Sequence, residues 1–205
     1  GMIILPVITK LLGVANYGIW AQLRGVVTLI APFALLGLPS ALVRFLPAEK
    51  DKKRVQDGVY SVLALISVIA FIVALFFLFF SGFIANFFQT QPVLIKILSL
   101  IIILECLNVV ILDALVAFQE LKKYSFLLIF QTIGQILLVI GAVFLGYGLY
   151  GAVLSLLFIR LITFFLLSIY IFKKIGIKIP TFSPIKKYLY FSLPLLGGSL
   201  FYWVV

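Results

Sequence analysis

The sequence contains no histidine, one cysteine (Cys106) and only six acidic residues among 205. Without histidine the chain lacks the commonest general base and the commonest zinc ligand, and a single cysteine cannot form an internal disulfide. Charged residues make up 11% of the chain, whereas a soluble domain carries about 25%. These absences argue against a secreted disulfide-stabilised domain and against a metalloenzyme, so we predict no metal site and no cofactor.

Apolar residues are abundant instead. They make up 65% of the chain, and the mean hydropathy is +1.33. A soluble domain of this length could not keep so much apolar surface out of water. Segments of about 20 apolar residues, by contrast, are long enough to cross a bilayer as helices. The composition therefore predicts an all-α integral membrane protein.

Charged and turn-forming residues divide the apolar sequence into about six spans and the start of a seventh. We place the spans near residues 1–12, 17–46, 59–80, 93–118, 124–145 and 150–172, and the seventh opens at Tyr188. The second span contains Pro32 and Pro39, and either proline removes a backbone hydrogen bond and kinks a helix. Because the chain starts at Gly1 with half a span and stops within another, we expect it to be a fragment.

Basic residues alternate between the predicted connections. Connections 47–57, 119–124 and 173–187 hold four, two and five of the sixteen Lys and Arg residues, and the intervening ones hold none. Since basic residues concentrate in cytoplasmic loops, these three are predicted to be cytoplasmic. This distribution accounts for most of the net charge of +10. The aromatic residues lie in the spans instead of alternating with the basic ones, so we predict no nucleic-acid binding.

A few charged residues fall inside the predicted spans, where each costs several kcal/mol if it faces lipid. Arg24, Glu105, Asp113 and Arg160 lie away from both predicted surfaces. Arg44 lies near the end of its span and can snorkel to the interface. The first four should therefore face other helices or a water-filled cavity.

Helical periodicity groups further polar residues with these charges. At 100° per residue, Glu105, Asn108 and Asp113 fall within an arc of about 140° on the fourth span. Gln131 and Gln135 are four residues apart on the fifth span and share one face. Two interpretations stay open. The charges either form ion pairs that join the spans, or they line a polar cavity in which arginines bind an anionic headgroup and carboxylates take up H⁺ or Na⁺.

Three stretches carry a resemblance to a known family. LLGVANYGIWA at 11–21 is similar to the stretch that follows the first span of polysaccharide-biosynthesis flippases of the O-antigen type. GLPSALVRFL at 37–46 resembles the end of their second span, and SLPLLGGSLFYW at 192–203 resembles the opening of their seventh. These flippases belong to the multidrug/oligosaccharidyl-lipid/polysaccharide exporter superfamily. The order of spans and the spacing of basic loops agree with the resemblance over the whole chain.

The resemblance implies a transporter of two six-helix bundles around a central cavity, in a prokaryotic cell membrane. Residues 1–187 would form the N-terminal bundle and residues 188–205 the start of the second. The implied function is the flipping of a polyprenyl-diphosphate-linked oligosaccharide by alternating access, with no enzymatic activity. The implied partners are the lipid-linked oligosaccharide, membrane lipids and polysaccharide-assembly enzymes. By residue, the expected roles are diphosphate binding by Arg24, Arg160 and Arg44, ion coupling by Glu105 and Asp113, and lining of the polar cavity by Asn108, Gln131 and Gln135.

Two other functions are weighed against this one. An antiporter of the same superfamily would expel cationic drugs in exchange for H⁺ or Na⁺, but such cargo favours a cavity dominated by carboxylates. Here two interior arginines, Arg24 and Arg160, balance two interior acids, Glu105 and Asp113. A membrane glycosyltransferase would need a catalytic base or metal-binding acids in sizeable loops, whereas these loops are short and contain no Asp-x-Asp.

Overall fold

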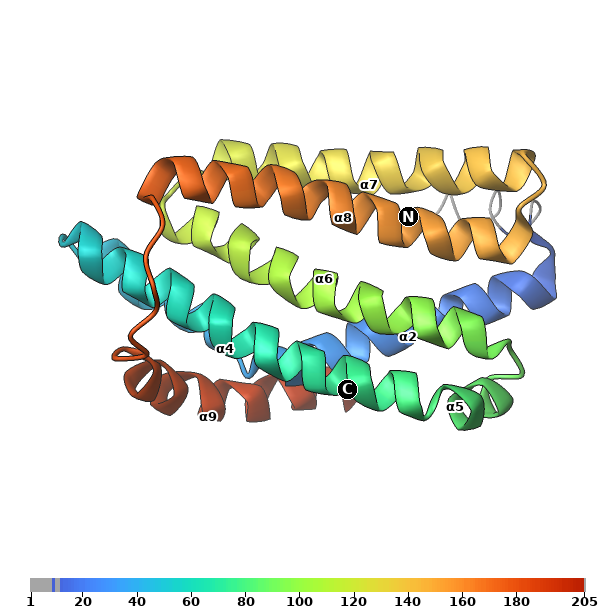
Figure 1. Ribbon diagram of the computed structural model, residues 1–205, viewed down its shortest axis with the longest axis horizontal. Coiled ribbons are helices and arrows are strands. Elements are labelled where there is room, and N and C mark those ends of the chain that lie inside the picture. The colour runs from blue at the N-terminus through green and yellow to red at the C-terminus, as the bar shows by residue number, and fades with distance from the viewer. Residues whose placement is uncertain (1–8, 10–11, 205) are drawn as a thin grey trace.

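The computed structural model describes Thr9 and residues 12–204, and for residues 196–204 the backbone alone. In this part of the chain the secondary structure is entirely helical, which confirms the predicted all-α fold (Figure 1). The elements are α2 (Val14–Leu35), α3 (Leu38–Phe45), the short 3-10 helix η1 (Leu46–Ala48), α4 (Lys52–Phe79), α5 (Ser81–Phe87), α6 (Pro92–Ala117), α7 (Leu121–Phe144), α8 (Gly148–Ile175) and α9 (Ile185–Val204).

Five helices among the described residues, α2, α4, α6, α7 and α8, are long and apolar enough to cross a membrane. They correspond to the predicted second to sixth spans and confirm a multi-span helical membrane protein. The predicted first span, 1–12, lies outside the described residues except for Thr9 and Leu12. The division into bundles 1–187 and 188–205 stays a prediction.

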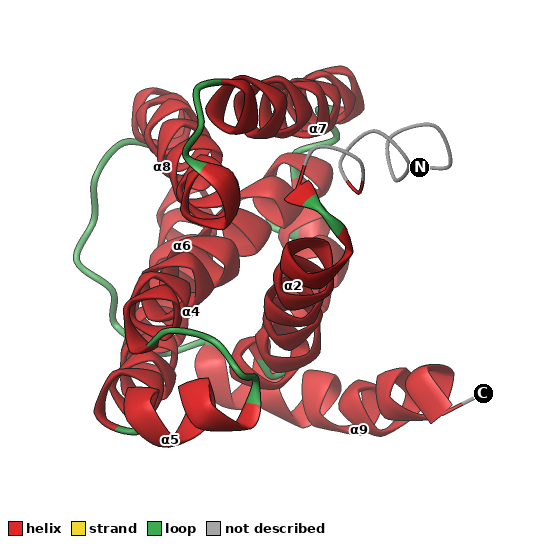
Figure 2. Cartoon of the chain, turned by 90° about the vertical axis from the view of Figure 1, so that its right-hand side faces the viewer, coloured by secondary structure: helices red, strands yellow, loops and turns green. Residues whose placement is uncertain are grey.

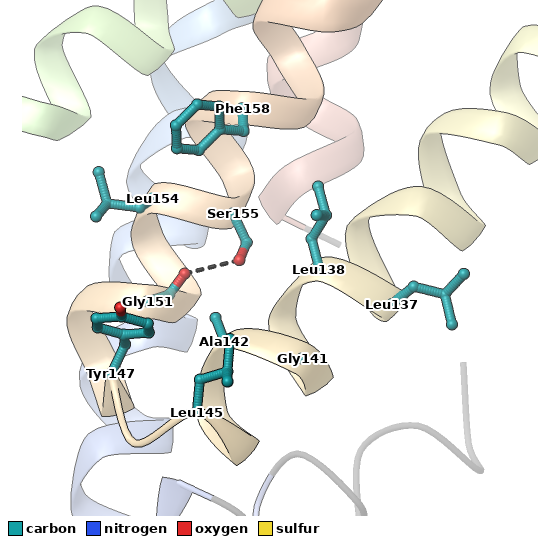
Figure 3. Close-up of a pocket in the computed structure, with 10 residues that line it drawn as sticks. All are labelled: Leu137, Leu138, Gly141, Ala142, Leu145, Tyr147, Gly151, Leu154, Ser155 and Phe158. Atoms are coloured by element: carbon teal, nitrogen blue, oxygen red, sulfur yellow. Dashed lines mark hydrogen bonds between the residues drawn. The ribbon is translucent and has the colours of Figure 1, made fainter.

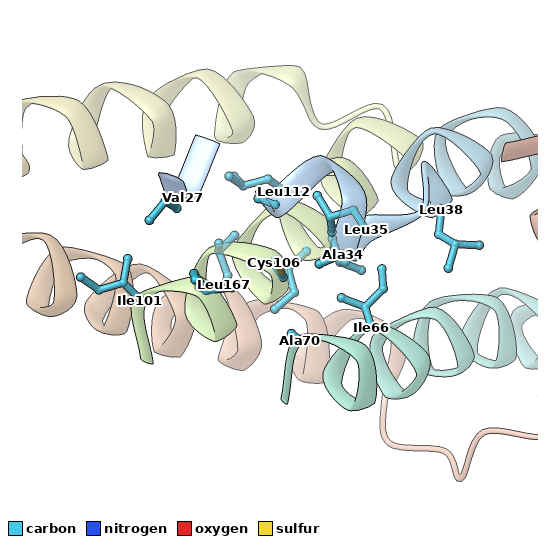
Figure 4. Close-up of a cluster of buried hydrophobic side chains, with 14 of the residues drawn as sticks. Val27, Ala34, Leu35, Leu38, Ile66, Ala70, Ile101, Cys106, Leu112 and Leu167 are labelled. Atoms are coloured by element: carbon cyan, nitrogen blue, oxygen red, sulfur yellow. The ribbon is translucent and has the colours of Figure 1, made fainter. Parts of the chain in front are cut away.

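Helix α6 lies at the centre of the bundle and packs against α4, α8, α2 and α3 (Figure 2). Its buried residues are spread around the helix, as expected of a helix surrounded by others. Figure 4 shows its Cys106 among core side chains from α2, α4 and α8. Cys106 is fully buried and unpaired, and we interpret it as a small packing residue.

Helix α7 is peripheral and packs mainly on α8. Few of its side chains are buried, and the two helices approach closely at glycines. A Cβ at Gly134 would lie 2.7 Å from Cδ1 of Ile159, and one at Gly151 would lie 2.8 Å from Cβ of Ala142. Both distances are too short for real contacts. The end of the Ile159 side chain could shift, whereas Cβ of Ala142 is fixed to its backbone, so Gly151 is the glycine that limits the α7–α8 separation.

The predicted second span, 17–46, consists of two helices joined by a break, and the two prolines had indicated a distortion in this segment. α2 ends at Leu35, and both Leu36 (φ 50°) and Gly37 (φ 66°) adopt the left-handed conformation. Pro32 remains inside α2, and Pro39 occupies the first turn of α3, where its missing N–H is tolerated. The break therefore falls between the prolines, where glycine permits a positive φ.

Two predicted connections contain more helix than expected. α4 begins within the charged segment 47–57, because the Asp51 side chain accepts a hydrogen bond from the Lys53 N–H at 2.9 Å and caps the helix. The polar turn predicted at 81–92 holds the short helix α5. At the other end of the bundle, α8 continues past residue 172 to Ile175, and Gly176 (φ 80°) terminates it.

The three basic connections lie at one end of the bundle (Figure 1). Asp57 of α4 accepts hydrogen bonds from the N–H and the hydroxyl of Thr181 at 2.7 and 2.6 Å, which ties α4 to the α8–α9 connection. Glu120, between α6 and α7, forms an ion pair with Lys174 of α8. We call this the basic end. Which face of the membrane it occupies stays a prediction.

Candidate functional site

Three charged side chains form a cluster where α2, α6 and α8 pass one another. Arg24, Glu105 and Arg160 lie near the middle of α2, α6 and α8, respectively. Nε of Arg160 lies 2.5 Å from Oε2 of Glu105, and both side chains are largely buried. Arg24 is close enough for its charge to interact with both partners. We call these three residues the central charged cluster. With every member charged, it carries one net positive charge.

Neutral polar side chains surround Arg160. Asn108, which is fully buried, donates from Nδ2 to the Arg160 carbonyl at 2.9 Å. The same carbonyl accepts from the Thr163 hydroxyl at 3.0 Å, and Gln131 of α7 reaches Thr163 at 3.5 Å. Asn108 Oδ1 is buried without a partner among the described residues. The polar environment therefore extends from α6 through α8 to α7.

Arg24 differs from Arg160 in what surrounds it. Its guanidinium carbon lies 5.1 Å from the centre of the Trp20 ring, one turn earlier on α2, and its side chain is exposed. Trp20 is 3% exposed, and its Nε1 has no partner among the described residues. The indole face attracts the cation and holds it at the edge of the cluster. Arg24 thus has no carboxylate as close as the one that Arg160 has.

Arg44 lies apart from the central charged cluster, toward the basic end. Its guanidinium carbon lies 4.5 Å from the centre of the Phe191 ring of α9 and 6.0 Å from that of Phe45. Nζ of Lys187 lies 4.5 Å from the centre of the same Phe45 ring. Arg44 and Lys187 therefore form an exposed cationic and aromatic surface between α3 and α9.

Asp113 lies two turns beyond Glu105 on α6 and faces the α2–α3 break. It lines a cavity of about 230 Å³ together with Pro32, Leu35, Gly37, Pro39, Ser40, Val109 and Leu195. Eight helical residues separate the two acids by about 12 Å along the axis. Glu105 and Asp113, which were predicted to share one broad face of α6, therefore have different surroundings. Glu105 forms an ion pair with α8, and Asp113 faces the break between α2 and α3.

An apolar cavity of about 420 Å³ lies between α7 and α8 (Figure 3). Leucine, alanine and phenylalanine side chains line most of it, and the Ser155 hydroxyl donates to the Gly151 carbonyl at 2.7 Å. This cavity offers no charged group for a polar ligand.

Gln135 on α7 is half-buried and makes no hydrogen bond with any described residue.

The structure thus brings Arg24, Glu105, Arg160, Asn108 and Gln131 into one region and places Arg44 and Asp113 elsewhere. The contact between Trp20 and Arg24 was missed by the sequence reasoning, which treats tryptophan as an interfacial anchor. The four-residue spacing could have indicated it, since residues four apart share a helix face. Asp57 was also missed, because its partner Thr181 is distant in the sequence.

Comparisons with known proteins identify one family. A family model described as "Polysaccharide biosynthesis protein" matches residues 1–205. Neither the search of curated proteins nor the search of solved structures finds a match.

Proposed function

The chain belongs to the polysaccharide biosynthesis protein family, and from this membership we propose that the complete protein flips a polyprenyl-diphosphate-linked oligosaccharide across a prokaryotic cell membrane. A sugar headgroup cannot cross about 30 Å of hydrocarbon unaided, because its hydroxyls would lose their hydrogen bonds to water. A polar cavity replaces those bonds while the lipid tail stays in the bilayer. Alternating exposure of the cavity to the two sides completes the transfer.

The observation that carries the proposal is the net positive charge of the central charged cluster. Two arginines, Arg24 and Arg160, face a single carboxylate, Glu105, within a membrane-spanning bundle. Such an excess favours an anionic headgroup over a cationic drug. Arg24 is the better candidate for the diphosphate, because its guanidinium is exposed and held by an aromatic ring. Arg160 would have to exchange its bond to Glu105 for one to the substrate.

The other proposed roles follow from position. Asn108 and Gln131 surround Arg160 and would line the polar pathway beside it, and Gln135 lies one turn further along α7. Arg44 would attract the headgroup or anionic lipids at the basic end, which we propose to be cytoplasmic. The proposed partners are the lipid-linked oligosaccharide, membrane lipids and the enzymes that assemble the polysaccharide. The proposed role is transport and involves no catalysis.

The test uses the complete protein in proteoliposomes that contain a fluorescent polyprenyl-diphosphate oligosaccharide. Translocation is measured for the wild type, for Arg24→Ala and for Lys96→Ala, which removes an exposed lysine on α6 outside the cluster. A hydrogen bond to a charged group contributes about 1.5–3 kcal/mol, so Arg24→Ala should slow translocation by about tenfold or more. Lys96→Ala should leave it unchanged.

Two results would contradict the proposal at different levels. Normal flipping by Arg24→Ala would remove the assigned role of Arg24 and leave the transport function in place. A wild-type protein that moves no lipid-linked sugar, yet exchanges cationic drugs for H⁺ or Na⁺, would replace the flippase by the antiporter.

A further inference from the structure

The α2–α3 break leaves several main-chain carbonyls without their helical hydrogen bonds, among them those of Pro32 and Leu35. The Leu36 N–H donates to the Phe33 carbonyl at 3.2 Å, three residues back. It therefore does not donate to the Pro32 carbonyl, which would be its acceptor in a regular α-helix. Pro39 has no N–H and cannot serve the Leu35 carbonyl, four residues before it. Pro32 and Leu35 both line the cavity beside Asp113. Within a membrane, carbonyls freed in this way need another partner.

Asp113 adds a carboxylate to the same cavity. It is half-buried and makes no hydrogen bond or ion pair with any residue that the structure describes. Glu105, on the same helix, has Arg160 as a partner. An unpaired carboxylate inside a membrane-spanning bundle costs free energy. Asp113 is therefore a candidate for binding a ligand.

The side chains around the cavity also favour a cation over an anion. The Ser40 hydroxyl is a further neutral oxygen in its wall. The C-terminal end of α2, at Leu35, carries a partial negative charge and the N-terminal end of α3, at Pro39 and Ser40, a partial positive one, so the two helix dipoles oppose each other here and the carboxylate of Asp113 supplies the net negative charge. No basic side chain lines the cavity among the described residues. A carboxylate, carbonyl oxygens and a hydroxyl are hard ligands, and one carboxylate balances one monovalent charge.

We propose that Asp113, the carbonyls of the α2–α3 break and Ser40 form a Na⁺ site. Broken helices in transporters bind coupling ions through unwound carbonyls and C-terminal helix ends, and this cavity offers the same chemistry. The site deepens the proposed function and depends on it only for what the bound Na⁺ does during transport. Na⁺ would draw Asp113 of α6 toward the break and fix the angle between α2 and α3.

The test measures binding of ²²Na⁺ to the complete purified protein in detergent, with no lipid-linked substrate present. Asp113→Asn keeps the side-chain shape, removes the charge and should lose saturable binding. Ser40→Ala alters an exposed residue that tolerates substitution and should weaken binding. Asp51→Asn is the matched control, since it makes the same change at the exposed cap of α4 and should bind as the wild type does. Elution from a sizing column verifies that each variant is folded.

The outcomes separate the site from the transport function. Absence of saturable Na⁺ binding in the wild type would overturn the proposal, and so would unchanged binding in Asp113→Asn and Ser40→Ala. Because the assay contains no oligosaccharide, either result leaves the flippase assignment untouched. Conversely, a wild type that binds Na⁺ through Asp113 and moves no lipid-linked sugar would retain the site and lose the proposed cargo.

Discussion

Glu105 and Arg160 hold opposite charges 2.5 Å apart on neighbouring helices, α6 and α8. Removing one partner leaves the other charge buried and unpaired, which costs about 3–5 kcal/mol, whereas removing both costs much less. We therefore expect Glu105→Gln or Arg160→Gln to lower the thermal stability of the detergent-solubilised protein strongly. The double variant should recover most of the loss. Lys96→Gln, an exposed substitution on α6, is the control, and strictly additive effects of the two single variants would show that the pair is not coupled.

At the scale of the residue, the sequence was enough to identify the unusual groups and not their partners. Hydropathy marks Arg24, Glu105, Asp113 and Arg160 because a charge in an apolar segment is conspicuous. Periodicity gives the direction of each side chain around its own helix. It does not say which helix lies opposite, so the pairing of Glu105 with Arg160, and the lack of a partner for Asp113, required the packing of α6 against α8 and α2.

At the scale of the element, positions of helices follow from the lengths of apolar segments, and their ends depend on single capping residues. The prolines indicated a distortion between residues 17 and 46. They could not locate it at Leu36 and Gly37, because proline is tolerated both inside α2 and in the first turn of α3. In the same way, the Asp51 cap moves the start of α4 into a segment that its charge alone assigns to a loop.

Glu120, in the short connection between α6 and α7, binds side chains of α8 through an ion pair and hydrogen bonds. Burial by itself raises the pKa of this carboxyl, but hydrogen bonds from Lys174, Tyr170 and Lys123 outweigh it and lower the pKa to about 2, from a usual 4.5. The carboxyl of Glu120 takes up a proton more readily in the unfolded protein than in the folded one. Its contribution to the free energy of unfolding is therefore complete above pH 4.5 and is lost as the pH falls toward 2.

Glu120→Gln should therefore lower the free energy of unfolding by about 1–2 kcal/mol at neutral pH, since hydrogen bonds to a charged group are stronger than neutral ones. The difference from the wild type should shrink as the pH falls from 4.5 toward 2. Thermal unfolding across this range measures it. Glu49→Gln, which removes a looser ion pair with Arg54 (3.8 Å), is the comparison. A difference that does not change with pH would exclude the charge of Glu120 as its cause.

At the scale of the whole molecule, the two ends of the bundle differ in charge. The connections at the basic end contact one another through Asp57, Thr181, Glu120 and Lys174. At the opposite end, Tyr150 donates a hydrogen bond to Gln91, which joins the start of α8 to the turn before α6. Each long helix crosses the bundle once, so successive connections lie at opposite ends. The basic connections therefore gather at one end of the bundle and the uncharged connections at the other.

This polarity predicts the orientation of the protein in the cell membrane, since basic loops are retained in the cytoplasm. Ile179→Cys, in the α8–α9 connection, and Tyr147→Cys, between α7 and α8, place thiols at exposed positions of opposite ends. A membrane-impermeant maleimide added to intact cells should label Tyr147→Cys at once and Ile179→Cys only after permeabilisation. The native Cys106 is fully buried, so the wild type should stay unlabelled and serves as the control. The reverse labelling pattern would invert the orientation and place Arg44 and the basic end outside the cell.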